Sequence, residues 1–208
     1  IAVAEKSNLF NAPETYMDKI AISSSEKGIV DLDNTVTKNI KNLAEYKNTK
    51  PDHLTACILD RPRHKKHIDE LKALNVKLKL ISDGDVSGAL LVTDKNYNVD
   101  IFLGIGGGPE GVLAASALDA YGCFFQGKFL FDNNNDKLRA KKMGIEDFEK
   151  KYELNEIVSG DSIFCATGIT SGDLVNGIDL KKDSYIAETL VTHKSSDIRK
   201  IVKSSHKI

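Results

Sequence analysis

Apolar and polar residues alternate in blocks through the middle of the chain, and these blocks predict strands and helices in turn. Three short apolar runs are typical of buried strands: residues 54–60, 76–81 and 99–105. Each run is followed by a segment with a helical pattern: residues 62–75, 86–93 and 110–120. This alternation indicates a parallel sheet with helices packed on its faces, joined by right-handed crossovers.

The flanking segments carry weaker patterns. Residues 31–48 repeat apolar positions at helical spacing, and Asp33 or Thr35 can cap the helix. Residues 136–152 predict two short helices separated near Gly144. Four further segments predict strands: residues 123–131, 162–167, 188–193 and 197–208.

Composition excludes several classes of protein. Of the 208 residues, 41% are hydrophobic and 28% are charged, which is typical of a globular protein with a core. The net charge of −1 argues against nucleic acid as a partner, and no apolar run is long enough to cross a membrane. Three distant cysteines, Cys57, Cys123 and Cys165, predict reduced, buried thiols and a cytoplasmic setting. Because the chain starts at Ile1 within a strand-like run, we expect it to be a truncated form.

Three polar motifs follow the three central strands: residues 60–64, 82–85 and 106–111. In an open parallel sheet, ligands bind outside the carboxyl ends of the strands. The three motifs are therefore predicted to face one cleft.

The first motif suits a phosphate. Arg61 and Arg63 flank Pro62 at the predicted start of a helix, where backbone N–H groups and guanidinium groups favour an anion. Two solvated arginines are the alternative. In the second motif, Asp83 and Asp85 flank Gly84, and could bind a metal or sugar hydroxyls. Taken alone, that motif is more typical of an ordinary acidic turn.

The third motif matches the G-x-G-x-x-G pattern of dinucleotide-binding proteins through Gly106, Gly108 and Gly111. Glu110 would place a negative charge where the pyrophosphate must lie, and Pro109 removes a backbone donor. The residues therefore favour a metal ligand over a dinucleotide cradle. A glutamate that only stabilises its own helix remains an alternative. The five histidines are expected at the surface.

Several motifs together resemble one family, the class II fructose-1,6-bisphosphatases. They are LDRPRH, ISDGDVSGAL, LGIGGGPEGVLAASAL, MGIEDF and FCATGITSGDLVNGI, with APETYMDKIAI near the start. The resemblance covers essentially the whole chain. Gly108 stands where the family usually has alanine, and Ser171 where it often has aspartate.

The resemblance implies a layered α/β (α+β) protein with the inositol monophosphatase-like sugar phosphatase fold. Residues 1–50 would be the end of an N-terminal domain with a connecting helix, and residues 51–208 a sugar-phosphate-binding domain. The implied activity is Mn²⁺- or Mg²⁺-dependent hydrolysis of the 1-phosphate of fructose 1,6-bisphosphate, a step of gluconeogenesis, in a homo-oligomer.

The resemblance also assigns residues. Tyr16 and Gly107 would contact the substrate, and Glu110 would bind the metal. The Arg61–Pro62–Arg63 strip would contact the far phosphate of the substrate. The Asp83–Gly84–Asp85 segment would contact its sugar. No residue is assigned as catalytic, and the other metal ligands are expected upstream of Ile1. We therefore expect weak activity from this chain alone. Two alternatives remain: a dinucleotide-dependent oxidoreductase, and a non-catalytic sugar-phosphate-binding subunit.

Overall fold

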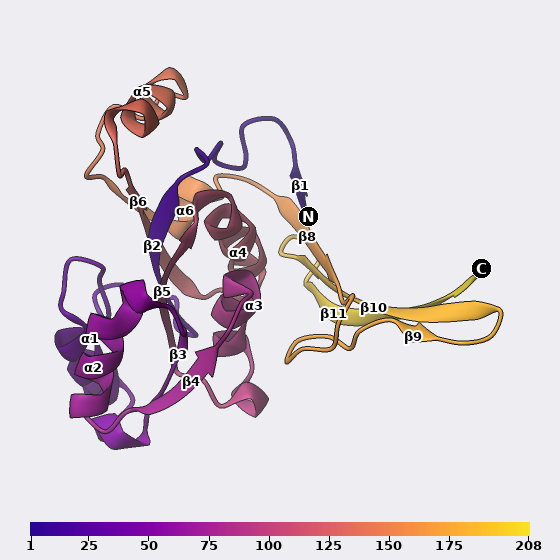
Figure 1. Cartoon of the computed structure of the whole chain (residues 1–208), viewed down its shortest axis with the longest axis horizontal. Coiled ribbons are helices and arrows are strands. Elements are labelled where there is room, and N and C mark those ends of the chain that lie inside the picture. The colour runs from indigo at the N-terminus through magenta and orange to yellow at the C-terminus, as the bar shows by residue number, and fades with distance from the viewer.

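Two sheets organise the chain, and the computed structural model describes all 208 residues (Figure 1). The larger sheet has six strands in the order β4-β3-β5-β2-β6-β7. The smaller one has the order β1-β8-β10-β11, with β9 paired to β10. The architecture is mixed α/β, as the sequence predicts.

The larger sheet contains the predicted parallel core. Its strands are β2 (Tyr16–Ile22), β3 (Thr55–Leu59), β4 (Lys77–Ile81), β5 (Ile101–Gly107), β6 (Phe124–Leu130) and β7 (Lys151–Glu153). β3 pairs in parallel with both β4 and β5. β2 lies antiparallel between β5 and β6, so the complete sheet is mixed. This register sets Tyr16 opposite Gly107, at the edge where β3, β4 and β5 end.

Helices cover both faces of the larger sheet (Figure 1). The helices of the chain are α1 (Val36–Tyr46), α2 (Lys65–Ala73), α3 (Asp85–Leu90), α4 (Gly108–Tyr121), α5 (Asn134–Lys142) and α6 (Leu154–Ile157). Of these, α5 projects beyond the end of β6 (Figure 1). α1 begins after Thr35, whose hydroxyl accepts a hydrogen bond from Lys38 N. α1 and α2 bury Ile40 and Leu71 with Ile20 of β2. α3, α4 and α6 pack on the opposite face.

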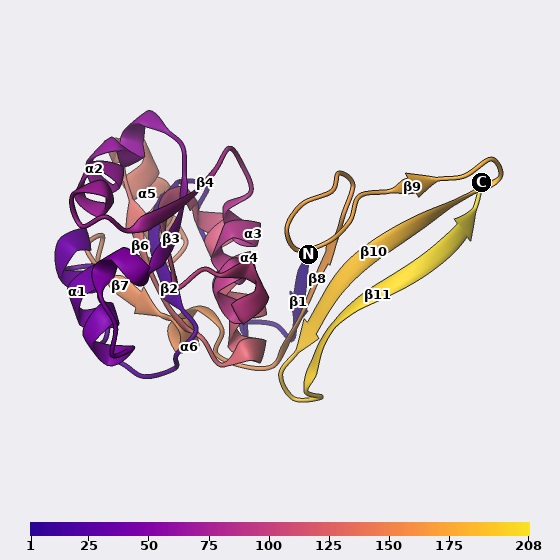
Figure 2. The ribbon, with the colours of Figure 1, turned by 90° about the horizontal axis from the view of Figure 1, so that it is seen from below.

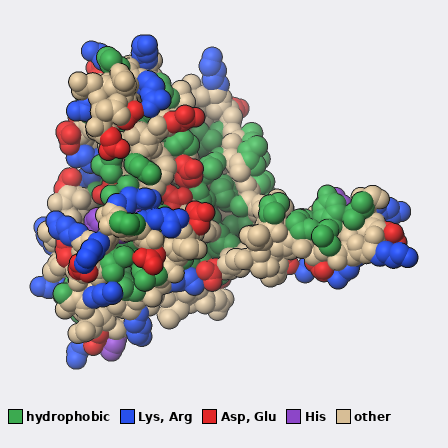
Figure 3. All heavy atoms as spheres, viewed as in Figure 1, with side chains coloured by type: hydrophobic (Ala, Val, Ile, Leu, Met, Phe, Trp, Pro, Cys, Tyr) green, Lys and Arg blue, Asp and Glu red, His purple; other side chains and the backbone are tan.

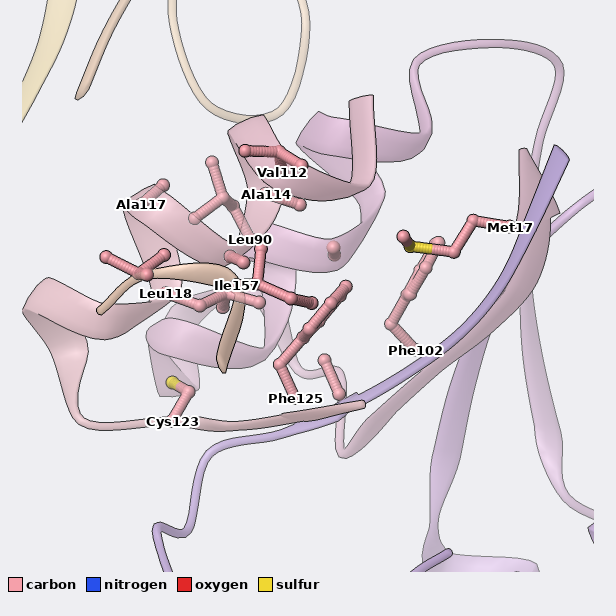
Figure 4. Close-up of a cluster of buried hydrophobic side chains, with 14 of the residues drawn as sticks. Met17, Leu90, Phe102, Val112, Ala114, Ala117, Leu118, Cys123, Phe125 and Ile157 are labelled. Carbon is pink, nitrogen blue, oxygen red and sulfur yellow. The ribbon is translucent and has the colours of Figure 1, made fainter. Parts of the chain in front are cut away.

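Alternation along β2 divides the core into two clusters. Ile20 and Ile22 face α1 and α2, while Met17 and Ala21 join the cluster beneath α3 and α4. Figure 4 shows Met17, Phe102 and Phe125 projecting from the strands toward these helices. The sheet therefore has a buried layer on each face.

Small residues let α4 lie between the two sheets. Ala114, Ala115 and Ala117 are fully buried, and α4 also contacts β8, β10 and β11. The hydroxyls of Ser116 and Ser162 are 2.9 Å apart across this contact. The helix ends at Gly122, whose φ of 65° is the left-handed conformation that glycine adopts readily.

The smaller sheet extends away from the body as an arm (Figure 2). Its strands are β1 (Ala2–Ala4), β8 (Ser162–Thr167), β9 (Asp179–Leu180), β10 (Ser184–His193) and β11 (Ile198–Lys207). The predicted strands over 162–167, 188–193 and 197–208 are confirmed. Apolar side chains gather on the arm (Figure 3), and its exposed members include Leu180, Ile201 and Val202.

One predicted element is wrong. The second short helix expected in residues 144–152 is absent, because Gly144 ends α5 with a φ of 90° and the chain continues into β7. β7 pairs with β6, and its Tyr152 packs against Phe10 and Phe129. Tertiary packing therefore overrides the local helical pattern.

β2 lies in the same sheet as β3 to β7, and α1 packs on that sheet. The division of the chain into two domains at residue 50 stays a prediction. No helix combines the length and the apolar character needed to cross a membrane.

Candidate functional site

The three predicted motifs converge at one edge of the larger sheet. β3, β4 and β5 run parallel, so the segments that follow them leave at the same edge. The start of β2 joins them because β2 is antiparallel to β5. Four chain segments therefore meet at this edge, and a convergence of this kind is where open α/β sheets bind ligands.

Arg63 joins two of these segments. Its guanidinium carbon lies 4.9 Å from the centroid of the Tyr16 ring, and its Nε donates a 3.0 Å hydrogen bond to Ile105 O. Cation–π contact of this kind restricts the guanidinium orientation. The two terminal nitrogens of Arg63, Nη1 and Nη2, make no hydrogen bond within the chain. They are free to bind an anion as a fork.

Arg61 lies beside Arg63 but is held less firmly. The only hydrogen bond of its side chain is a 3.4 Å contact from Nη1 to the carbonyl of Asp60. Pro62 starts a 3-10 turn, Pro62–His64, that leads into α2. No carboxylate contacts either guanidinium, so the strip carries two uncompensated positive charges.

His64 anchors the strip from below. The side chain is fully buried: Nδ1 donates to Leu59 O at 2.8 Å, and Nε2 accepts from Ile105 N at 2.8 Å. Burial lowers the pKa of His64 and thereby favours the neutral ring that these two bonds require. The expectation that all histidines lie at the surface is wrong here. The sequence signal was available, because His64, Ile68 and Leu71 repeat at helical spacing.

The second motif forms a turn and then the start of α3. Gly84 has a φ of 80°, and the amide of Gly84 donates to Asp83 Oδ1 at 2.8 Å. Asp83 is exposed. Asp85 is the first residue of α3, and its side chain is only 13% exposed because it is ion-paired with Lys19.

Lys19 supports two residues of the site from inside the protein, and sequence reasoning missed it. Its side chain is 1% exposed, and its ammonium donates to Asp85 Oδ2 and, at 3.0 Å, to Gly107 O. Burial lowers the pKa of Lys19, while Asp85 opposes that shift. The signal was its position between Met17 and Ala21, on the buried face of β2.

The glycines of the third motif are required by close contacts inside the protein. A Cβ at Gly106 would lie 2.0 Å from Asp85 Oδ2, and one at Gly107 would lie 1.9 Å from Glu110 Oε2. At Gly111, a Cβ would meet Met17 Sδ at 2.4 Å. Internal packing therefore accounts for the pattern without a dinucleotide.

A cavity of about 570 Å³ opens at this edge. Four carboxylate residues are among those that line it: Glu14, Glu110, Asp132 and Asp136. Oxygen ligands of this kind suit Mg²⁺ or Mn²⁺. However, no group of three or more His, Cys, Asp or Glu side chains is arranged to hold a metal ion. The carboxylate oxygens are suitable ligands for a hard cation. However, this chain does not bring enough of them together to hold one.

The fold and this edge define an α/β protein with an arginine strip that lacks a carboxylate partner, beside a buried lysine–aspartate pair. The family described as bacterial fructose-1,6-bisphosphatase, glpX-encoded, matches residues 1–206. The chain belongs to this family, as the motifs predict. Nothing in the comparisons supports a dinucleotide-dependent oxidoreductase.

Individual relatives agree with this assignment. The chain is 35% identical over 219 aligned residues to a protein of Trichodesmium erythraeum (strain IMS101). It is 36% identical to relatives in Synechococcus elongatus and Thermosynechococcus vestitus. Each of these is named D-fructose 1,6-bisphosphatase class 2/sedoheptulose 1,7-bisphosphatase. The alignments cover 99% of this chain but only 63–64% of each relative's length.

Proposed function

We propose that this chain forms the sugar-phosphate-binding part of a metal-dependent phosphatase. The reaction is hydrolysis of the 1-phosphate of fructose 1,6-bisphosphate, in which water adds to phosphorus and the sugar oxygen leaves with a proton. The products are fructose 6-phosphate and phosphate, as in gluconeogenesis. The convergence of an unpaired arginine strip with Asp85 and Gly107 at one edge carries the proposal, together with family membership.

In this proposal, Arg61 and Arg63 bind the phosphate that is not cleaved. Tyr16 and Ile105 O hold Arg63, so its fork is oriented before the ligand arrives. Pro62 sets the turn that brings both arginines to the edge. Binding energy from this remote phosphate would then orient the reacting one.

The sugar would lie against the second and third motifs. Asp83 and Asp85 offer carboxylate oxygens to hydroxyl groups, and Gly84 allows the turn that directs them. Gly107 lines the cavity, and the lack of a side chain there leaves room for Glu110 beside the ligand. A ketose such as sedoheptulose, which the relatives' name includes, has similar hydroxyl groups.

Glu110 would contribute one ligand to Mn²⁺ or Mg²⁺ from the first turn of α4. Such a metal, when bound, neutralises phosphate oxygens and lowers the pKa of a bound water. Because one carboxylate holds Mg²⁺ poorly, further ligands must come from outside these 208 residues. Glu110 itself lies over Gly107, which keeps the metal ligand beside the sugar contact.

Three broader features belong to the same proposal. The layered sheets support an inositol monophosphatase-like fold. The proposal keeps residues 51–208 as the sugar-phosphate-binding domain and residues 1–50 as the end of the preceding one, with β2 contributing a strand to the larger sheet. Exposed apolar residues on the arm support a homo-oligomer. Free cysteines support a cytoplasmic setting.

Phosphate release from fructose 1,6-bisphosphate tests the proposal. The assay compares this chain alone with the same chain joined to the amino-terminal part of a full-length relative, each with Mn²⁺ or Mg²⁺. We expect turnover only in the joined form, and we expect Glu110→Gln to abolish it there. Glu45→Gln, an exposed position on α1, is the matched control.

Two outcomes contradict the proposal in different ways. Robust turnover by the 208-residue chain alone would show that outside metal ligands are unnecessary. No turnover in a folded joined form, with substrate and metal saturating, would reject the phosphatase. The absence of a metal-binding group in this chain would then favour a non-catalytic sugar-phosphate-binding subunit.

A further inference from the structure

Lys19 connects two site segments that no other side chain joins. It projects from β2 on the face that carries Met17 and Ala21, and its stem runs beneath the start of α4. The ammonium lies between the start of α3 and the end of β5, where it donates to Asp85 Oδ2 and to Gly107 O.

A charged group at this depth is costly unless it has partners. Removing an ammonium from water is unfavourable by several kcal/mol in proteins, and a well-packed apolar pair is often at least as stable. The chain also keeps two glycines at this point. A Cβ at Gly106 would lie 3.0 Å from Lys19 Nζ, and one at Gly111 would lie 3.3 Å from Lys19 Cδ. The local sequence therefore accommodates an ion pair where methionine or leucine would pack more simply.

The geometry of Asp85 indicates what the pair achieves. Oδ2 is bound to Lys19, whereas Oδ1 has no hydrogen-bond partner within the protein. The side chain is 13% exposed, and Oδ1 is not among the buried side-chain atoms that lack a partner, so this oxygen is accessible to solvent. The ion pair with Lys19 and the close approach of Gly106 together fix the orientation of this carboxylate at the first position of α3.

We propose that Lys19 is a positioning residue for sugar recognition: it holds Asp85 and the Gly107 carbonyl so that Asp85 Oδ1 faces a sugar hydroxyl. This inference rests on the proposed function and deepens it. Lys19 contacts neither Arg61 nor Arg63 in the structure. Its effect should therefore be confined to the sugar and spare the phosphate.

The test uses NMR titration to measure the affinity of the 208-residue chain for two ligands. These ligands are fructose 6-phosphate and inorganic phosphate. Lys19→Met should weaken fructose 6-phosphate binding about tenfold, which corresponds to about 1.4 kcal/mol. Binding of inorganic phosphate should change less than about twofold, since the arginine strip is intact. Lys151→Met is the control, because Lys151 also bridges two partners, Asp31 and Asp33, and neither partner belongs to the three motifs of the site.

A double-mutant cycle separates positioning from direct contact. If Lys19 acts through Asp85, then adding Lys19→Met to Asp85→Asn should weaken fructose 6-phosphate binding by less than about twofold further. If the losses of affinity caused by the two single substitutions multiply in the double variant, the inference is overturned. So would a Lys19→Met variant that loses both ligands equally, or one that loses neither.

Gly106→Ala keeps the test decisive if Lys19→Met does not fold. The new methyl group would displace the Asp85 carboxylate while leaving both charges present, and we expect the same selective loss of fructose 6-phosphate. Unchanged affinity in a folded Gly106→Ala chain would overturn the inference. If the parent chain binds neither ligand, the proposed function fails and this inference fails with it. If the parent binds fructose 6-phosphate and the Lys19→Met variant binds it with the same affinity, only the inference is rejected.

Discussion

Arg63 lies over the ring of Tyr16, with 4.9 Å between the guanidinium carbon and the ring centroid. The two residues come from different elements, since Tyr16 begins β2 and Arg63 follows β3. The same guanidinium donates through Nε to Ile105 O, so its plane is held on two sides. The contact orients the remaining nitrogens before any ligand binds, which reduces the entropy lost on binding.

Arg63→Lys should therefore impair binding without unfolding the chain. Lysine retains the charge but loses the fork and the stacked plane. We expect affinity for fructose 6-phosphate to fall about tenfold, or about 1.4 kcal/mol, with little change in melting temperature. NMR titration and a thermal melt measure the two quantities.

Arg199→Lys is a matched control for this change. Arg199 also lies over a tyrosine ring, 6.0 Å from the centroid of Tyr121, and donates to a backbone carbonyl, Ala120 O, at 2.8 Å. It belongs to β11, far from the cavity residues. Equal losses of affinity in both variants would argue against a binding role for Arg63.

Two glycine positions of the third motif, Gly107 and Gly111, should respond differently to alanine. At Gly107 the new methyl group would meet the end of the Glu110 side chain, which can rotate into solvent. At Gly111 it would meet buried Met17 at 2.4 Å. We expect Gly107→Ala to cost little stability, and Gly111→Ala to cost about 1–3 kcal/mol by overpacking.

Urea unfolding of the two variants checks this ordering. Gly107→Ala should still displace Glu110, and so should lower metal-dependent turnover in the joined form described above. If Gly111→Ala were as stable as the parent, the glycine pattern would need another explanation. Binding of a nicotinamide dinucleotide by the parent would supply one.

The parallel core could be predicted because each of its strands is a short apolar run followed by a helical face. β3, for example, is buried along its whole length, so periodicity and burial agree. The insertion of β2 between β5 and β6 could not be predicted, since antiparallel pairing over such separations leaves no local pattern. The helix expected after Gly144 was wrong because β7 gains more from pairing with β6.

The convergence of the motifs could be predicted from topology, but their internal supports could not. Arg63, Asp85 and Glu110 stand in polar segments that follow strands, where function is expected. Lys19 stands inside the apolar pattern of β2, whereas His64 stands in a polar motif and only continues the apolar face of α2. A single charged or polar residue at such a position is ambiguous in sequence. Only the three-dimensional contacts show that each one joins two separate segments of the edge.

Thiol reactivity provides a test of the core. Cys57 and Cys123 are buried, and burial raises the pKa of each thiol to about 12. The reactive thiolate is then scarce at neutral pH. We expect at most one thiol, the half-buried Cys165, to react with a disulfide reagent in the native state, and all three to react in denaturant. Rapid reaction of two or more native thiols would contradict this packing; Cys165→Ser identifies the reactive position.

Stability should fall in mild acid because of His64. Its folded-state pKa is lowered by burial, with Arg63 and His67 adding repulsion, while its unfolded value is about 6.5. The unfolded chain therefore binds the proton more readily. The contribution of the neutral ring is fully present above about pH 6.5 and is lost as the pH falls from there toward the lower folded pKa.

Urea unfolding between pH 7.5 and 5 measures this loss, with a slope from His64 of at most about 1.4 kcal/mol per pH unit. In His64→Gln, the amide can still donate to Leu59 O and accept from Ile105 N, but it does not titrate. We expect that variant to be less stable at neutral pH and to have a flatter slope below pH 6.5. His53→Gln, at an exposed position, should keep the parent slope. If His64→Gln kept it as well, the acid sensitivity would have to come from carboxylates, and the buried hydrogen bonds of His64 would not be its cause.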